Sequence, residues 1–350
     1  MLIFANPHHA RHAGRHEMFR GRLVPCHEVP ARLDQVLAEL ARRPMGELCS
    51  PDDPPAGLLE RVHAPRYLRF LQGAWAQWLA LDAANGAVDA LPSVWPVRGF
   101  RADVEPDNFA ARLGLYSFDA GTPLTAGTWD AAVAGAACAA SAARALQGPA
   151  APRATMALTR PPGHHAGPDF FGGYCFLNNG AIAAQALRDG GAQRVAVLDI
   201  DYHHGNGTQT LFEARRDVLT VSIHGDPRTE YPFYLGHADE RGHGDGEGFN
   251  LNLPLPAGTG FPTWRGALQQ ALQRVADHAP GALVVALGVD TFEQDPISRF
   301  SLSSADYRVI GADLASLGLP VVFTLEGGYA VAAMGVNVVN VLEGFRERAG

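Results

Sequence analysis

The chain has 350 residues, and its 28 basic residues against 36 acidic ones give a formal net charge of −8. Hydrophobic residues make up 47% and charged residues 18%, which is typical of a globular protein and too apolar for a disordered one. The negative charge disfavours nucleic acid as a partner. No apolar run approaches the roughly 20 residues that span a membrane, so we expect no membrane partner.

The N-terminus shows no signal peptide, because histidines and arginines follow a short apolar start. We therefore expect a cytoplasmic protein. The four cysteines form no C-x-x-C pair, which argues against a disulfide framework and against a thiolate metal site. They are Cys26, Cys49, Cys138 and Cys175.

Helix and strand patterns alternate along the chain. Helices are predicted within 127–148, 176–191 and 303–318, the last with a Ser303-x-x-Asp306 capping signal. Continuously hydrophobic strands are predicted at 194–200, 281–289 and 319–328, with a further strand from residue 154. This alternation predicts an α/β fold with one open, doubly wound, mostly parallel sheet flanked by helices, and a ligand site at the carboxyl ends of the strands.

Residues 84–126 depart from this regularity, with scattered Pro, Gly and acidic residues and little periodicity. A segment this long without clear elements is usually functional or an interface. We expect a single domain over 1–350 that carries this insertion-like segment.

Polar residues follow four of the predicted strands. They are His164 and His165, then Asp199, Asp201 and His203, then Asp290, and finally Glu326 and Tyr329. The carboxyl ends of parallel strands meet at one edge of a sheet. This set therefore predicts the rim of an active site.

In the stretch "LDIDYHHGNG", carboxylates and histidines follow a buried strand, and metal binding accounts for their presence there. Alternate residues of an extended chain share a face, so Asp199, Asp201 and His203 are expected on one side. Two of them with Asp290 supply three ligands and leave a fourth position open, as in a catalytic zinc site. Helix capping is the alternative for any single aspartate, but it does not account for the whole set.

The adjacent pair His164 and His165 follows a rigid Pro-Pro-Gly turn. An imidazole beside a metal-activated water can act as a general base, because its ordinary pKa lies near neutrality. The N-terminal histidines are given no chemistry; they are His8, His9, His12 and His16.

Four ordered motifs resemble the histone deacetylase superfamily, and within it the bacterial acetylpolyamine amidohydrolases. They are "RPPGHHAGPDFFGGYCFLNN", "LDIDYHHGNGTQ", "LGVDTFEQDPISRFSLSSADY" and "LEGGY". The resemblance extends over nearly the whole chain. It implies the fold of the arginase and deacetylase proteins.

The resemblance also implies the metal sites. Asp201, His203 and Asp290 would bind one zinc ion per chain. Asp199 would orient His164 and, with Ser222, help to bind a structural potassium ion. An Asp-His-Asp set also accepts iron or cobalt, so the native metal stays open.

The resemblance assigns His165 as the base and acid, and Tyr329 as the hydrogen-bond donor to the oxyanion. Many histone deacetylases have an aspartate where this chain has Asn206. An amide can orient His165 but cannot raise its pKa by charge, so we expect a neutral His165. The residues expected to line the tunnel to the metal are Tyr174, Tyr231 and Gly173.

The implied reaction removes the acetyl group from a small cationic amine such as N-acetylputrescine or N-acetylcadaverine. The implied assembly is a homodimer, in which residues 84–126 take part and constrict the site. Glu105, Asp107 and Asp119 are candidates to meet the distal ammonium of the substrate, although for any one of them a solvated loop charge is the favoured interpretation.

Three alternatives remain. A protein lysine deacetylase would use the same chemistry. A two-manganese hydrolase of the arginase type needs additional carboxylates, and "GVDTFEQDP" offers only Asp290 and Asp295. A non-catalytic binding protein is disfavoured, because the full set of ligands, histidines and tyrosine is present.

Overall fold

The computed structural model describes residues 1–148 and 150–349. Within these residues, eight strands form one sheet in the order β4-β1-β5-β10-β9-β6-β7-β8, and every neighbouring pair is parallel. The strands are β1 (Leu2–Ala5), β4 (Glu47–Cys49), β5 (Ala154–Leu158), β6 (Val195–Asp199), β7 (Val218–Gly225), β8 (Asn250–Leu255), β9 (Ala282–Leu287) and β10 (Val321–Leu325). The predicted fold class is therefore confirmed.

The four central strands are buried along their whole length. This burial explains their continuous hydrophobicity, since helices cover both faces of the sheet. The observed strands are shorter than predicted: β6 spans residues 195–199 and β10 spans 321–325. The polar residues after each strand leave the sheet at its carboxyl edge and are free to build a site there.

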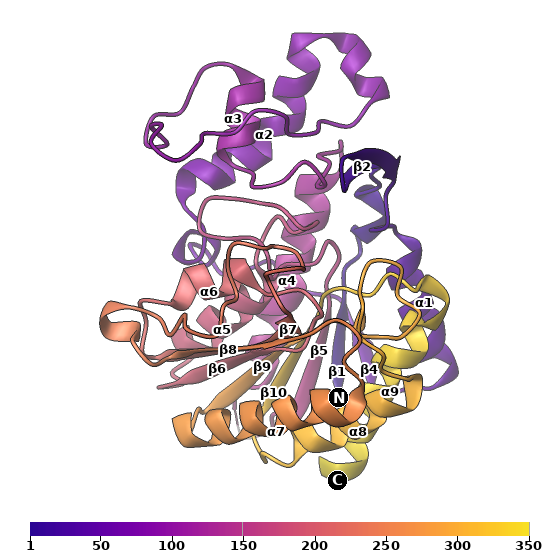
Figure 1. Ribbon diagram of the computed structural model, residues 1–350. Helices are drawn as coiled ribbons and strands as arrows, with labels where there is room; N and C mark the ends of the chain where they lie inside the picture. Colours follow the sequence, from indigo (N-terminus) through magenta and orange to yellow (C-terminus); the bar gives the residue numbers. More distant parts are fainter. Residues whose placement is uncertain (149, 350) are drawn as a thin grey trace.

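Two helical layers enclose the sheet (Figure 1). Leu198 and Val285 belong to the core cluster that holds α7, α8 and α9. Val197 and Val284, one residue earlier on the same strands, belong to the cluster that holds α4 and α5. The helices are α1 (Ala31–Arg42), α2 (Pro65–Leu81), α3 (Phe109–Leu115), α4 (Thr128–Ala145), α5 (Asn179–Asp189), α6 (Asn206–Phe212), α7 (Phe261–His278), α8 (Ser304–Ala315) and α9 (Val331–Ala349).

The predicted helices correspond to α4, α5 and α8. The capping signal of α8 is formed, because the Asp306 carboxylate accepts a hydrogen bond from the Ser303 backbone N–H at 2.7 Å. None of the helices that the structure describes is both long enough and apolar enough to cross a membrane.

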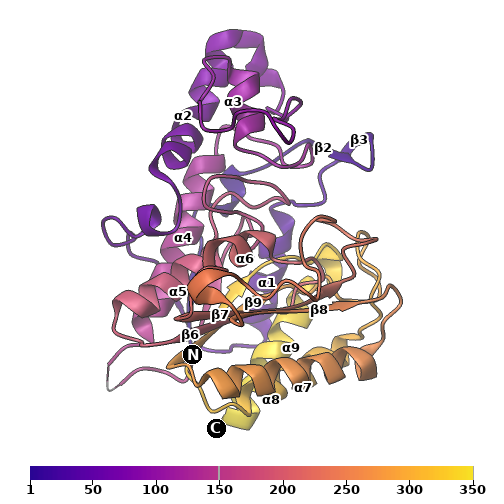
Figure 2. The same ribbon diagram turned by 60° about the vertical axis from the view of Figure 1, so that its left-hand side comes forward.

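Residues 84–126 are more regular than predicted. The segment forms α3, and an isolated bridge pairs Ala90 with Leu124. Phe109 of α3 is buried, and its ring lies 6.4 Å from that of Phe70 in α2. With the hairpin of β2 (His16–Phe19) and β3 (Arg22–Pro25), α2 and α3 extend beyond the sheet (Figure 2). The expectation of a segment without elements was wrong here, because α3 has only seven residues, which is too short for a helical period to show in the sequence.

Candidate active site

The candidate metal ligands lie together at the carboxyl edge of the sheet. Asp201 and His203 follow β6, and Asp290 follows β9, the neighbouring strand. Each offers one ligand atom, and the three atoms lie within 4.8 Å of one another. His203 Nδ1 is 3.0 Å from Asp290 Oδ2 and 3.4 Å from Asp201 Oδ1.

The shared-face argument holds only in part. The strand ends at Asp199, and the chain then bends through Asp201 and His203. Asp199 does not join the three ligand residues, because its carboxylate lies 2.9 Å from His164 Nδ1 instead. The bend after the strand, and not its alternation, brings Asp201 and His203 to Asp290.

The donor set fits a divalent cation. Asp201 and Asp290 are both fully buried. Burial and the neighbouring Asp201 carboxylate raise the pKa of Asp290 to about 7, so this site disfavours two negative charges without a cation. A Cβ atom at Gly327 would lie 2.5 Å from a carboxylate oxygen of each aspartate. The chain therefore closes tightly around oxygen and nitrogen ligands that suit zinc.

The two adjacent histidines have different partners. His164 Nδ1 faces the Asp199 carboxylate, and His165 Nδ1 donates a hydrogen bond to Asn206 Oδ1 at 2.7 Å. Glu326 fixes the turn before them, because its carboxylate accepts hydrogen bonds from the backbone N–H groups of Gly163 (2.6 Å) and His164 (3.0 Å). The sequence placed Glu326 at the rim but did not reveal this role.

These partners give the two imidazoles opposite charge preferences. Burial would lower the pKa of His164, but the carboxylates of Asp201 and Asp199 outweigh burial and raise it to about 10. Burial, together with the charges of His164 and His203, lowers the pKa of His165 well below its usual value. The structure therefore gives the same direction as the sequence argument from Asn206.

Tyr329 is held by two residues whose role the sequence did not reveal. Its backbone N–H donates to Asp295 Oδ2 at 2.7 Å. The guanidinium carbon of Arg32 lies 4.8 Å from the centre of its ring, and Arg32 Nε donates to the Gly328 carbonyl at 2.7 Å. Asp295 therefore binds backbone next to the site. The contacts that we see do not make it a ligand of a second metal.

A cavity of about 610 Å³ leads to this group of residues, and His165, His203 and Tyr329 all line it. The predicted tunnel residues Gly173, Tyr174 and Tyr231 line it as well. Gly173 has φ +54°, and a Cβ atom there would lie 2.2 Å from the His165 ring. A larger side chain at Gly173 would thus displace the histidine.

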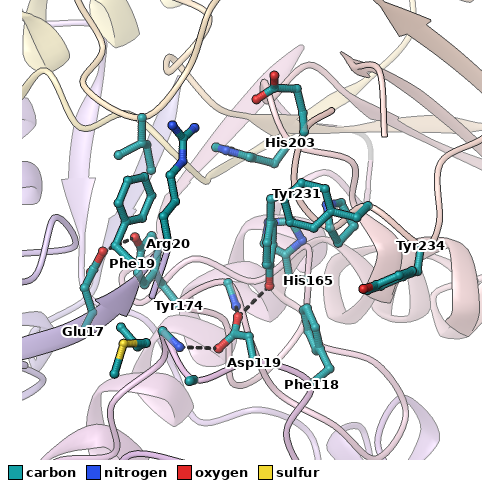
Figure 3. A pocket seen from close by; sticks show the side chains of 18 of the residues that line it. Glu17, Phe19, Arg20, Phe118, Asp119, His165, Tyr174, His203, Tyr231 and Tyr234 are labelled. Atoms are coloured by element: carbon teal, nitrogen blue, oxygen red, sulfur yellow. Dashed lines mark hydrogen bonds between the residues drawn. The ribbon is translucent and has the colours of Figure 1, made fainter. Parts of the chain in front are cut away.

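Of the three acids predicted to meet the substrate ammonium, one lies in the cavity wall. Asp119 Oδ2 accepts a hydrogen bond from the Tyr231 hydroxyl at 2.6 Å (Figure 3) and another from the Gly173 backbone N–H at 2.7 Å. Glu105 and Asp107 are exposed and do not line the cavity. The Glu105 carboxylate accepts a hydrogen bond from Tyr116 at 3.0 Å instead. The sequence of a loop does not show whether an acidic side chain points into a cavity or into solvent. The sequence therefore could not distinguish Asp119 from the other two acids.

Ser222 lies next to Asp199 in the sheet, since the two residues are register partners of β7 and β6. Both residues line a small void of about 10 Å³. The Ser222 hydroxyl lies 2.8 Å from His224 Nδ1. The structure thus brings the two predicted potassium ligands together.

A buried Asp-His-Asp group beside a histidine pair, at the carboxyl edge of a parallel sheet, is typical of a metal-dependent hydrolase. Residues 26–345 match the histone deacetylase domain, and the chain belongs to that family. It is 52% identical over 345 residues to acetylpolyamine amidohydrolase 2 of Pseudomonas aeruginosa, covering 99% of this chain and 98% of the relative.

Two further comparisons extend over the whole chain. Acetylpolyamine amidohydrolase of Mycoplana ramosa is 43% identical over 343 residues, which is 98% of each chain. The crystal structure of acetylpolyamine aminohydrolase from Burkholderia pseudomallei superimposes with a TM-score of 0.94 at 38% identity, covering 100% of both chains.

Proposed function

We propose that this protein is a zinc-dependent amidohydrolase that deacetylates acetylated polyamines or small acetyldiamines such as N-acetylputrescine and N-acetylcadaverine. The products would be acetate and the free amine. The observation that carries this proposal is the position of Asp119, a carboxylate in the wall of the cavity that leads to His165 and His203. The names of the full-length relatives support the same substrate class.

Asp201, His203 and Asp290 would hold the zinc ion, which when bound polarises the acetyl carbonyl and lowers the pKa of the attacking water. His165 is neutral, and its Nδ1–H is engaged by Asn206. Its Nε2 is therefore the atom that takes the proton of the water.

The remaining residues act on the developing charge and on the leaving group. Burial raises the pKa of the Tyr329 hydroxyl well above its usual value, so the group stays protonated and donates to the oxyanion. His164 is held as a cation by Asp201 and Asp199. The proton that His165 has taken then passes to the leaving amine.

Asp119 would select the cationic end of the substrate. Its partners are the Tyr231 hydroxyl and the backbone N–H groups of Gly173 and Gly121, all of them uncharged. Hydrogen bonds of this kind fix a carboxylate without cancelling its charge. The aromatic rings of Tyr174 and Tyr231 add surfaces that favour an ammonium group.

We include a structural potassium ion near Asp199 and Ser222 and a homodimer in this proposal. Apolar side chains between residues 88 and 104 support the dimer, because Val94, Val97 and Phe100 are 56%, 59% and 71% exposed. All four cysteines are free thiols, which suits the reducing cytoplasm.

The test is a comparison of kcat/KM for the zinc-loaded protein on N-acetylputrescine, N-acetylcadaverine and an acetyl-lysine peptide. We expect an acetyldiamine to be preferred by about a hundredfold, which corresponds to about 2.7 kcal/mol. A preference for the peptide would replace the polyamine proposal with a protein lysine deacetylase.

A further inference from the structure

Glu17 lies in the cavity wall beside the tunnel tyrosine Tyr174. It belongs to β2, at the far N-terminal end of the sequence, and it is only 1% exposed. Its Oε1 atom accepts a hydrogen bond from the Tyr174 hydroxyl at 2.8 Å and one from His27 Nδ1, also at 2.8 Å. Its Oε2 atom accepts a third from the His27 backbone N–H at 3.1 Å.

Three carboxylates line the cavity in the described chain, and each has a different kind of partner. Asp119 has only uncharged donors. Glu230 lies 3.0 Å from the guanidinium of Arg299, which is always charged. Glu17 is hydrogen-bonded to His27, an imidazole that can gain or lose a proton.

His27 can exchange protons with the solvent because its side chain is 25% exposed. The hydrogen bond to Glu17 raises the pKa of His27, and burial opposes it. The Asp295 carboxylate adds to the rise from the loop after β9. On the other side, the Phe19 ring lies 5.3 Å from His27, with the Arg20 guanidinium 5.1 Å from that ring.

We propose that His27 is a specificity-determining residue, whose protonation state sets the net charge on the Glu17 side of the cavity and thereby the preference for cationic over neutral acetylamides. His27 acts through Glu17 and touches no reacting atom, so it is a positioning residue. The inference rests on the proposed deacetylase function and deepens its substrate selection.

The charges of His27 and Glu17 determine how the preference for a cationic substrate changes with pH. With His27 protonated, its pair with Glu17 is neutral as a whole. With His27 neutral, Glu17 leaves one uncompensated negative charge in the wall, where Figure 3 places it near Tyr174. A unit charge in a partly buried wall changes the binding of an ammonium several ångströms away by on the order of tenfold.

The experiment compares two substrates of matched shape. N-acetylputrescine carries a terminal ammonium, and N-pentylacetamide has a methyl group in its place. The ratio of their kcat/KM values, measured from pH 5.5 to 8.5 in the zinc-loaded enzyme, cancels every titration that affects the chemistry alone. The substrate amine stays charged throughout, because its pKa is about 10. We expect the ratio to rise by about tenfold with pH.

Two variants separate charge from structure. His27→Asn keeps a donor for Glu17 but cannot be charged, so its ratio should be high and independent of pH. Glu17→Gln removes the carboxylate charge but leaves His27 able to titrate, so its ratio should be lower than that of the wild type at every pH and should rise at a lower pH. A flat ratio in the wild type, or the same rise in His27→Asn, would overturn the role of His27.

The outcomes also distinguish this inference from the proposed function. If neither acetylamide is hydrolysed at any pH, the proposed deacetylation of small acetylamines fails, and this inference fails with it. If both are hydrolysed at a ratio that does not change with pH, the function stands and His27 does not set specificity.

Discussion

The carboxylate of Asp295 holds the backbone N–H of Tyr329 at 2.7 Å. The same oxygen lies 3.2 Å from the backbone nitrogen of Ala330. The tyrosine is thus oriented from its backbone by a buried acid that does not itself line the cavity. The precision of the proposed oxyanion donor depends on that carboxylate.

Substitution of Tyr329 and substitution of Asp295 should both lower kcat, but by different amounts. Tyr329→Phe loses the oxyanion donor, and we expect a fall of about a hundredfold to a thousandfold in kcat. Asp295→Asn keeps one oxygen acceptor and only misplaces the tyrosine, so about tenfold is expected, with little change in KM. Steady-state kinetics on N-acetylputrescine measure both. An unaltered kcat in Asp295→Asn would show that Arg32 alone is sufficient to position the ring.

The charge of Asp119 should matter for cationic substrates only. In Asp119→Asn we expect kcat/KM for N-acetylputrescine to fall by about tenfold to a hundredfold, while that for N-pentylacetamide changes by less than about threefold. Asp107→Asn is the matched control, because Asp107 is exposed and lies outside the cavity. An equal loss in the control would show that the ammonium does not distinguish Asp119 from the exposed Asp107.

Zinc should bind once per chain and stabilise the folded state. The bound metal is first removed with a chelator, and zinc is then added and the excess removed by dialysis. We expect elemental analysis to find one zinc ion per chain, and we expect the Tm of the metal-free protein to rise when zinc is added. Asp290→Ala should lose both responses. The neighbouring Glu293 is exposed, so Glu293→Ala should retain them. Two zinc ions per chain would favour the arginase type of site.

Acid should destabilise the protein through buried neutral histidines such as His63. Its Nδ1–H donates to the Gly167 carbonyl at 2.8 Å, and its Nε2 accepts from the Asn178 backbone N–H at 2.9 Å. Burial lowers its pKa from 6.5 to about 4. Between these values the unfolded chain binds a proton that the folded chain does not, so stability is lost as the pH falls from 6.5 to 4. The loss approaches about 3 kcal/mol for this one residue.

Urea unfolding at pH 7.5, 5.5 and 4.5 measures this effect. His63→Gln should be less stable at pH 7.5 but should lose less free energy of unfolding on acidification. Replacement of the exposed His243 by Gln should leave the dependence of the free energy of unfolding on pH as it is in the wild type. If the free energy of unfolding changes with pH in the same way in the wild type and in both variants, the acid sensitivity comes from groups other than His63.

The sequence predicted those parts of the molecule whose structure follows from the residue pattern of a single segment. Buried central strands are hydrophobic throughout, and the polar residues after them mark the edge where Asp201 and Asp290 meet. Glu17 and His27 gave no such signal. The hairpin of β2 and β3 is short, and the hydrogen bond from the Tyr174 hydroxyl to Glu17 joins residues 157 positions apart. A contact of that kind depends on the assembled fold and not on any local pattern.

The strand order has a consequence for how the chain is made. β10 comes last in the sequence but lies between β5 and β9, in the middle of the sheet. Until β10 has been synthesised, β5 and β9 each lack one parallel neighbour, and nothing joins the two halves of the sheet. Tyr329 and Glu326 arrive with the strand that joins them. The last strand to be synthesised closes the sheet and completes the site in the same step.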